Sequence, residues 1–270
     1  MGYLKLGWKT TKKHSMLILG LYVYEFAWAF LLLKVVRDSV IPLLHRFPSG
    51  LSEYASRLFW AEGEFVLTRT TAANHYLLLL LALVLLRMGL TPFIRAGLFH
   101  AVHQAEKRAA GWRFFPGIRK LGKPFAMIYG AQMILTIGPL VWLYFRFAPA
   151  VMRAEQWSAL LPKLLPYVAG FLLYAALIQL LATLVQLGKT TGHGPMLTVM
   201  VLLRCAHIAA AIAAVIALVS IFAYALISAT SYVWAGLFAI IAHFAHQLVR
   251  IVLNVWRLSA QYHIWSKYVR

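Results

Sequence analysis

Six polar side chains interrupt long apolar runs at similar depths and are the residues most able to do chemistry. With a rise of ~1.5 Å per helical residue, all six lie roughly 9–13 Å from the inner edge of a membrane. They are Glu25, Arg87, Gln132, Gln179, His243 and His246. Because an intramembrane charge costs ~2.5–3.5 kcal/mol on insertion scales, such groups normally face the helix-bundle interior and pair. We expect a Glu25–Arg87 ion pair, which either lines a cavity open to the cytoplasm or fixes helix register.

Two histidine pairs share an i, i+3 spacing, His100 with His103 and His243 with His246. This spacing puts both rings of a pair on one face of a helix. Zinc or haem would require the two pairs to converge from facing helices. Their depths differ by a turn or more, and few carboxylates are placed to complete such a site. The sequence therefore predicts neither a metal site nor a cofactor.

Motifs for catalysis or nucleotide binding are weak. Residues 188–191 read GKTT, but the phosphate-loop pattern requires glycine where Thr183 stands. No Ser-His-Asp arrangement is readable, and only seven Asp and Glu are available for acid–base catalysis. The single cysteine, Cys205, excludes an intramolecular disulfide and a metal site built from cysteines. These features favour a non-catalytic protein.

The stretch 87–123 lies between two apolar runs and is strongly basic, with Glu106 as its only acid. A basic segment joined to membrane-spanning helices is almost always cytoplasmic. Besides Arg87, its cationic residues form a basic face for anionic lipid or a partner protein: Arg95, Lys107, Arg108, Arg113, Arg119, Lys120 and Lys123. Contact with anionic headgroups, worth about 1 kcal/mol per well-placed Lys or Arg, explains the net charge of +19. Nucleic-acid binding is not expected, because no recognition fold is readable.

The composition predicts an all-α polytopic integral membrane protein. The chain is 62% apolar, its mean hydropathy is +0.76, and several windows reach the ~20 residues that span a bilayer. We expect interfacial amphipathic helices: one over 51–59, either on the outer interface or packed over the mouth of the bundle, and one over 95–110 that continues the second membrane helix on the cytoplasmic side. We also expect a near-interface segment over 196–204 and tight turns at GKTTGHGP and SATS. Six transmembrane helices are predicted over residues 16–36, 74–94, 124–147, 164–187, 205–229 and 232–253.

The distribution of charge predicts that both termini are cytoplasmic. About two thirds of the 26 Lys and Arg fall in the segments on the inner side of this six-helix arrangement. The first apolar run continues to Lys34 with no small-residue cleavage site, so we expect it to be retained. We predict one membrane domain over 1–270, with a weak internal repeat relating 72–147 to 164–229.

The first 150 residues also resemble a known family in their layout. A basic N-terminus, KLGWKTTKKH, precedes an aromatic first helix, a long outer segment, the helix HYLLLLLALVLL and an inner stretch ending in GWRFFPGIR. This layout is similar to the membrane domain fused to some bacterial glycerophosphodiester phosphodiesterases and to related six-helix bacterial membrane families. The resemblance implies a multi-pass module of the bacterial cytoplasmic membrane. It implies no phosphodiesterase activity, because the catalytic barrel of those enzymes has no counterpart in this chain.

Two functions fit these features. The first is a non-catalytic accessory or scaffold protein that engages anionic lipid, or a membrane protein partner, through the basic face. The alternative is a small transporter or channel that uses the polar layer around Glu25 and Arg87. A membrane enzyme ranks third, since no cluster of acids or nucleophiles is readable.

Overall fold

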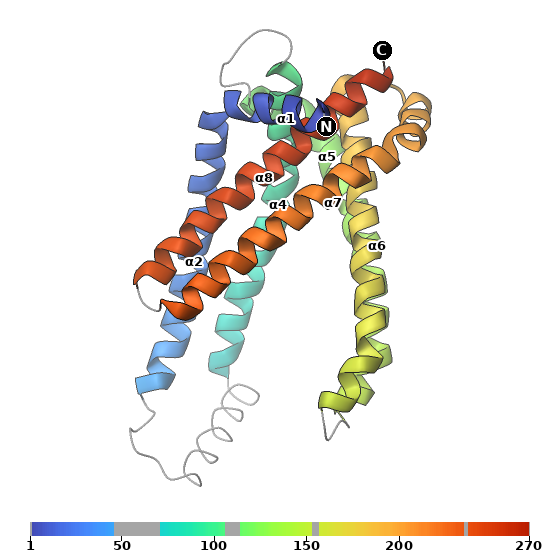
Figure 1. Cartoon of the computed structure of the whole chain (residues 1–270). Coiled ribbons are helices and arrows are strands. Elements are labelled where there is room, and N and C mark those ends of the chain that lie inside the picture. The colour runs from blue at the N-terminus through green and yellow to red at the C-terminus, as the bar shows by residue number, and fades with distance from the viewer. Residues whose placement is uncertain (1, 46–70, 106–113, 153–156, 235–236, 270) are drawn as a thin grey trace. The chain divides into compact units, whose positions relative to one another are not determined.

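A computed structural model describes residues 2–45, 71–105, 114–152, 157–234 and 237–269, and the regular elements in these ranges are all α-helices (Figure 1). Two predicted features lie wholly or partly outside them: the amphipathic helix over 51–59, and residues 106–113 of the basic stretch 87–123. The helices are α1 (Gly2–Lys13), α2 (Ser15–His45), α4 (Thr71–Ala105), α5 (Phe114–Met152), α6 (Trp157–Thr191), α7 (Pro195–Val233) and α8 (Leu237–Val269).

The chain divides into two compact units, each of which is described by itself. The larger unit comprises Met1–Ile18 and Pro92–Arg270, and the smaller unit is Leu19–Thr91. In α4 the boundary falls at Pro92, which has no backbone N–H to donate along the helix. One residue before this boundary, the Thr91 hydroxyl donates to the Arg87 backbone carbonyl at 2.7 Å.

Five helices among the described residues are long and apolar enough to cross a membrane, so this is a multi-pass helical membrane protein. The segments are Ser15–Val35, Leu78–Gln104, Phe114–Ala148, Leu164–Thr191 and Leu203–Thr230. The sequence predicts six, and the difference lies in the predicted span 232–253. Its start belongs to the end of α7, and its remainder is the first half of α8. Helix α8 is amphipathic and carries His243, His246 and Arg250 within this stretch, which lowers its hydropathy.

The predicted outer turn at residues 228–231 is wrong, because α7 continues through SATS to Val233. The Thr230 hydroxyl donates to the Ile227 carbonyl at 2.9 Å, which lets this polar stretch stay helical. The helix ends at Val233, and the backbone N–H of the next residue, Trp234, donates to the Thr230 carbonyl at 2.9 Å. At its other end α7 has no break near 204, yet its apolar span begins at Leu203, close to the predicted 205.

Helix α5 begins at Phe114, ten residues before the predicted start at 124, and it contains both Pro116 and Gly117. Pro116 falls in the first turn of the helix, where a missing N–H breaks no intrahelical bond. A Cβ built on Gly117 would lie 2.5 Å from the His100 Cβ, so glycine allows α5 to pass close to α4. The segment predicted over 74–94 and the described part of the segment predicted over 95–110 form one helix, α4.

The turn between α6 and α7 agrees with the prediction from GKTTGHGP. Gly192 has φ +80°, the left-handed conformation that commonly ends a helix. Its backbone N–H donates to the Lys189 carbonyl at 3.3 Å, and the His193 N–H donates to the Gly188 carbonyl at 3.1 Å. Pro195 then occupies the first turn of α7, where its fixed φ favours helix initiation.

Helix α1 was not predicted, and it packs against the second half of α8. The Trp256 ring N–H donates to the Leu4 carbonyl at 2.8 Å, and the Trp8 and Trp256 ring centroids are 5.3 Å apart. Thr10 Oγ1 and His263 Nε2 form a hydrogen bond of 2.8 Å. These contacts bring the two ends of the described chain together within the larger unit (Figure 1).

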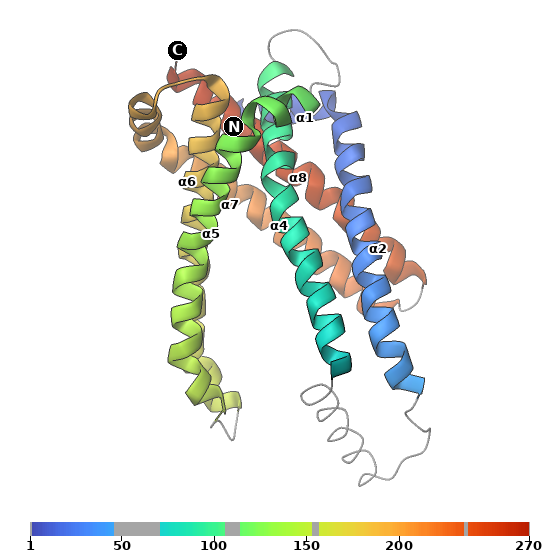
Figure 2. The same ribbon diagram turned by 180° about the vertical axis from the view of Figure 1, so that it is seen from behind.

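The buried core of the larger unit lies where five helices meet. It draws on the C-terminal end of α4, the start of α5, the end of α6, the first half of α7 and the second half of α8. Its members include Phe99, Val102, Phe125, Leu184, Leu187, Cys205, Ala209, Val255, Ile264 and Trp265. The apolar side chains in the rest of these helices are largely exposed, as expected for surfaces that contact lipid. Helices α7 and α8 continue from this core as neighbours of opposite direction (Figures 1 and 2).

Candidate functional site

The predicted ion pair between Glu25 and Arg87 is present in the smaller unit. Arg87 Nη2 donates to Glu25 Oε2 at 2.7 Å, and the Arg87 and Glu25 side chains are 38% and 28% exposed, respectively. The Arg87 guanidinium also lies 6.0 Å from the centroid of the buried Trp28 ring. Trp28 in turn contacts Tyr24, with ring centroids 6.2 Å apart. The two opposite charges therefore compensate one another beside an aromatic cluster of α2.

The other four residues of the predicted polar layer belong to the larger unit, where they have separate neighbours. Gln132 Oε1 accepts a hydrogen bond from Arg95 Nη1 at 3.3 Å. The His246 ring centroid lies 5.4 Å from that of Tyr224, while His243 is exposed. No hydrogen bond in the described part of the chain joins Gln132 or Gln179 to either histidine. The larger unit thus holds these residues on several helices without forming one network from them.

The two histidine pairs do not form a metal centre in the described residues, which contain no group of three or more His, Cys, Asp and Glu able to hold an ion. His103 Nδ1 instead forms a hydrogen bond of 3.0 Å with the Tyr262 hydroxyl. The two rings also meet edge to face, with centroids 5.7 Å apart. This contact ties α4 to α8 through an aromatic side chain that the sequence did not single out.

The predicted basic face is described only in part. Arg119, Lys120 and Lys123 are exposed on the first turns of α5, while Lys107, Arg108 and Arg113 lie outside the described residues. Arg95 differs from the exposed members because it is partly buried. Its guanidinium carbon lies 5.6 Å from the centroid of the Tyr129 ring, and its Nη1 bonds to Gln132.

Arg257 of α8 is a functional candidate that sequence reasoning missed, since it was counted only as part of a basic tail. It is partly buried. Burial lowers the pKa of the Arg257 guanidinium, and the positive charge of Arg95 lowers it further. The described residues of the larger unit contain no Asp or Glu, so Arg257 has no carboxylate partner among them.

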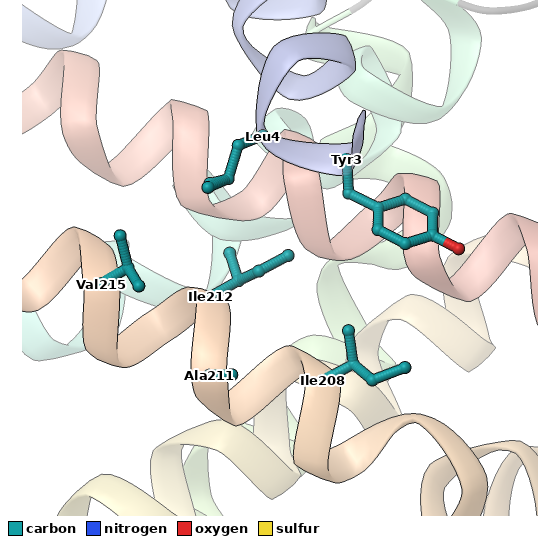
Figure 3. Close-up of a pocket in the computed structure, with 6 residues that line it drawn as sticks. All are labelled: Tyr3, Leu4, Ile208, Ala211, Ile212 and Val215. Atoms are coloured by element: carbon teal, nitrogen blue, oxygen red, sulfur yellow. The ribbon is translucent and has the colours of Figure 1, made fainter. Parts of the chain in front are cut away.

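An apolar cavity of about 160 Å³ lies between α1 and α7 (Figure 3). Four α7 side chains and two from α1 surround it: Ile208, Ala211, Ile212, Val215, Tyr3 and Leu4. A lining of this kind suits a hydrocarbon chain better than a charged group. Beside it, Lys267 Nζ lies 5.7 Å from the centroid of the Tyr3 ring. A hydrogen bond with Tyr3 raises the pKa of the Lys267 ammonium.

Comparisons of the chain with protein-family models, with curated proteins and with solved structures find no match. The resemblance to the membrane domain of bacterial phosphodiesterases therefore stays a prediction.

Proposed function

We propose that the chain is a non-catalytic accessory protein of a bacterial cytoplasmic membrane that engages anionic lipid through a basic cytoplasmic side. The observation that carries this proposal is α1. This amphipathic helix ends two residues before the first apolar span, and its four lysines are exposed. Its buried residues are Gly7 and Thr11, and α8 approaches it closely there: a Cβ on Gly7 would lie 2.9 Å from the Ala260 Cβ. A helix so placed lies in the membrane interface, with its lysines directed at the headgroups.

The contact between α1 and α8 also supports six crossings with both termini cytoplasmic. Helix α1 precedes the first of the five apolar spans, and the second half of α8 packs against it. Five crossings would leave the end of α7 on the opposite side of the membrane from α1. The first half of α8, which runs back along α7, therefore supplies the sixth crossing (Figure 2). The basic segments then face the cytoplasm, as the positive-inside rule requires.

This topology predicts the accessibility of cysteines introduced at the two ends of the chain. With Cys205 replaced by Ala, single cysteines at Lys5 and Lys267 should resist a membrane-impermeant maleimide in intact cells. Both should react once the membrane is permeabilised, since both positions are exposed in the structure. Labelling of the Lys267→Cys variant in intact cells would contradict the sixth crossing.

The lipid proposal is tested by neutralising the α1 lysines. A variant with Lys5, Lys9, Lys12 and Lys13 changed to Gln should lose the stabilisation that the wild type gains in nanodiscs of phosphatidylglycerol compared with phosphatidylcholine. The measurement is the midpoint of thermal unfolding in each lipid. The matched control changes Lys34 and Arg37, exposed on the far end of α2, to Gln and should keep the difference. A wild-type midpoint that is equal in the two lipids would contradict the proposal.

A further inference from the structure

The apolar cavity between α1 and α7 exists because both helices pack mainly on α8. Figure 3 shows the Tyr3 and Leu4 side chains of α1 directed toward α7, where Ile208 and Ile212 point back toward them. The space left between the two helices has a volume of about 160 Å³. An apolar cavity of about 150 Å³ in another protein is large enough to hold benzene. The cavity therefore has room for a segment of a hydrocarbon chain.

The position of this cavity along α7 indicates what fills it. Its four α7 residues belong to the apolar span Leu203–Thr230, so in the membrane they lie at the depth of the lipid chains. Ala211 and Val215 are exposed, which leaves the cavity open at the surface of the helix. A buried water needs several polar partners, and the lining side chains offer only the Tyr3 hydroxyl. A lipid chain is the occupant that this lining and this depth favour.

A positive charge lies at one edge of the cavity. Lys267 of α8 is exposed, and its Nζ lies 5.7 Å from the centroid of the Tyr3 ring. Tyr3 thus lines the cavity and contacts the cation. The described residues of the larger unit contain no Asp or Glu that could pair with Lys267. An ammonium group has three N–H donors, so Lys267 can bond to Tyr3 and still donate to a phosphate oxygen.

We propose that the cavity between α1 and α7 binds one acyl chain of an anionic phospholipid whose phosphate group lies against Lys267. The chain enters the apolar lining, and the headgroup stays beside α1, the helix that the proposed function places in the membrane interface. The inference rests on that function and deepens it. The exposed lysines of α1 attract anionic headgroups in general, whereas this site holds one lipid molecule in a defined place.

The test measures the midpoint of thermal unfolding of the full-length protein in detergent during titration with dioctanoylphosphatidylglycerol or dioctanoylphosphatidylcholine. Both lipids should raise the wild-type midpoint, and the anionic lipid should do so at lower concentration. Ala211→Phe fills the cavity from an exposed lining position. It should raise the concentration of either lipid needed for half the response by about tenfold, the effect of keeping roughly two methylene groups out of the cavity.

The matched control is Ala217→Phe, at an exposed position of α7 that does not line the cavity. It should leave both titrations unchanged. The midpoint without added lipid reports on folding, and Ala211→Phe should equal or exceed the wild type because the new side chain fills a cavity. If Ala211→Phe instead lowers this midpoint, Val215→Phe at the other exposed lining residue replaces it, with the same expected loss of the lipid response.

Variants of Lys267 test the headgroup contact separately. Lys267→Gln should reduce the response to dioctanoylphosphatidylglycerol to the level of dioctanoylphosphatidylcholine and leave the latter unchanged. Lys267→Arg keeps the charge and should keep the preference for the anionic lipid. Lys189→Gln, at an exposed lysine of α6, should also keep it. Equal wild-type responses to the two lipids would overturn the proposal.

The outcomes separate this site from the broader role of the α1 lysines. Full lipid responses in both Ala211→Phe and Lys267→Gln, with loss in the variant that lacks the four α1 lysines, would overturn the site and leave the proposed function intact. The opposite pattern, with loss in Ala211→Phe and Lys267→Gln and full retention in the α1 lysine variant, would support the site and contradict the role proposed for α1.

Discussion

Arg87→Met is expected to lower the free energy of unfolding by about 2.5–3.5 kcal/mol. The substitution keeps a long side chain in the span but leaves the Glu25 carboxylate, now bonded at 2.7 Å, without its counter-charge. It also removes the contact of the guanidinium with the Trp28 ring. The pair is partly exposed in the structure, but the surroundings of a spanning helix are lipid, so water does not offset the loss. Thermal unfolding in detergent measures the effect.

The matched control removes both charges. Glu25→Gln combined with Arg87→Met should be closer to the wild type than Arg87→Met alone, because replacing a buried pair costs less than breaking it. A double variant as unstable as the single variant would contradict the assignment of the two side chains as a mutually compensating pair. If the pair instead serves transport, the double variant would fold normally but would no longer transport its substrate.

Trp265→Ala is expected to lower the free energy of unfolding by about 3–5 kcal/mol. The side chain is 0% exposed and fills the core where α8 meets the turn between α6 and α7. Its ring N–H donates to Thr191 Oγ1 at 3.2 Å, so truncation also removes a partner of that turn. The readout is the temperature at which the detergent-solubilised protein loses its monodisperse elution peak.

Trp142→Ala is the control for this substitution. Trp142 lies in the apolar span of α5 and is 61% exposed, so its truncation opens no cavity in the core. We expect its midpoint to stay close to that of the wild type. Equal losses from Trp142→Ala and Trp265→Ala would show that the packed core does not lie at the meeting point of these helices.

The Glu25–Arg87 pair could be predicted because the cost of a charge in a membrane forces it to find a partner. The turn at residues 188–195 could be predicted because glycine and proline act locally. The helix ends at 114 and 233 could not, since Pro116 is tolerated in a first turn and Thr230 bonds to its own helix. Helix α1 could not be predicted from the sequence, because its stability depends on packing against α8, some 250 residues away in the chain.

Arg257 shows a second limit of sequence patterns. A lone basic residue in a C-terminal segment has the same appearance whether it faces solvent or a core. Only the packing of α8 decides that it is partly buried. The six residues of the predicted polar layer do not form one network, for a related reason. Equal depth does not decide which helix faces point toward one another.

Transport through the polar layer remains the alternative prediction, and the ion pair bears on it. Glu25 and Arg87 satisfy one another, which favours a structural role that fixes the register of α2 and α4. The lipid proposal uses different residues, the exposed lysines of α1. Variants of the two groups therefore distinguish the two functions.

Native mass spectrometry of the wild-type protein, purified from its own membrane in mild detergent, tests the lipid proposal most directly. The account predicts a protein that retains anionic phospholipid in clear excess over its share of the membrane extract, with at least one molecule lost when Lys5, Lys9, Lys12 and Lys13 are changed to Gln. Bound lipid with the composition of the bulk membrane would contradict the account. So would a stoichiometric protein partner without lipid enrichment, which would assign the basic side to a protein interface instead.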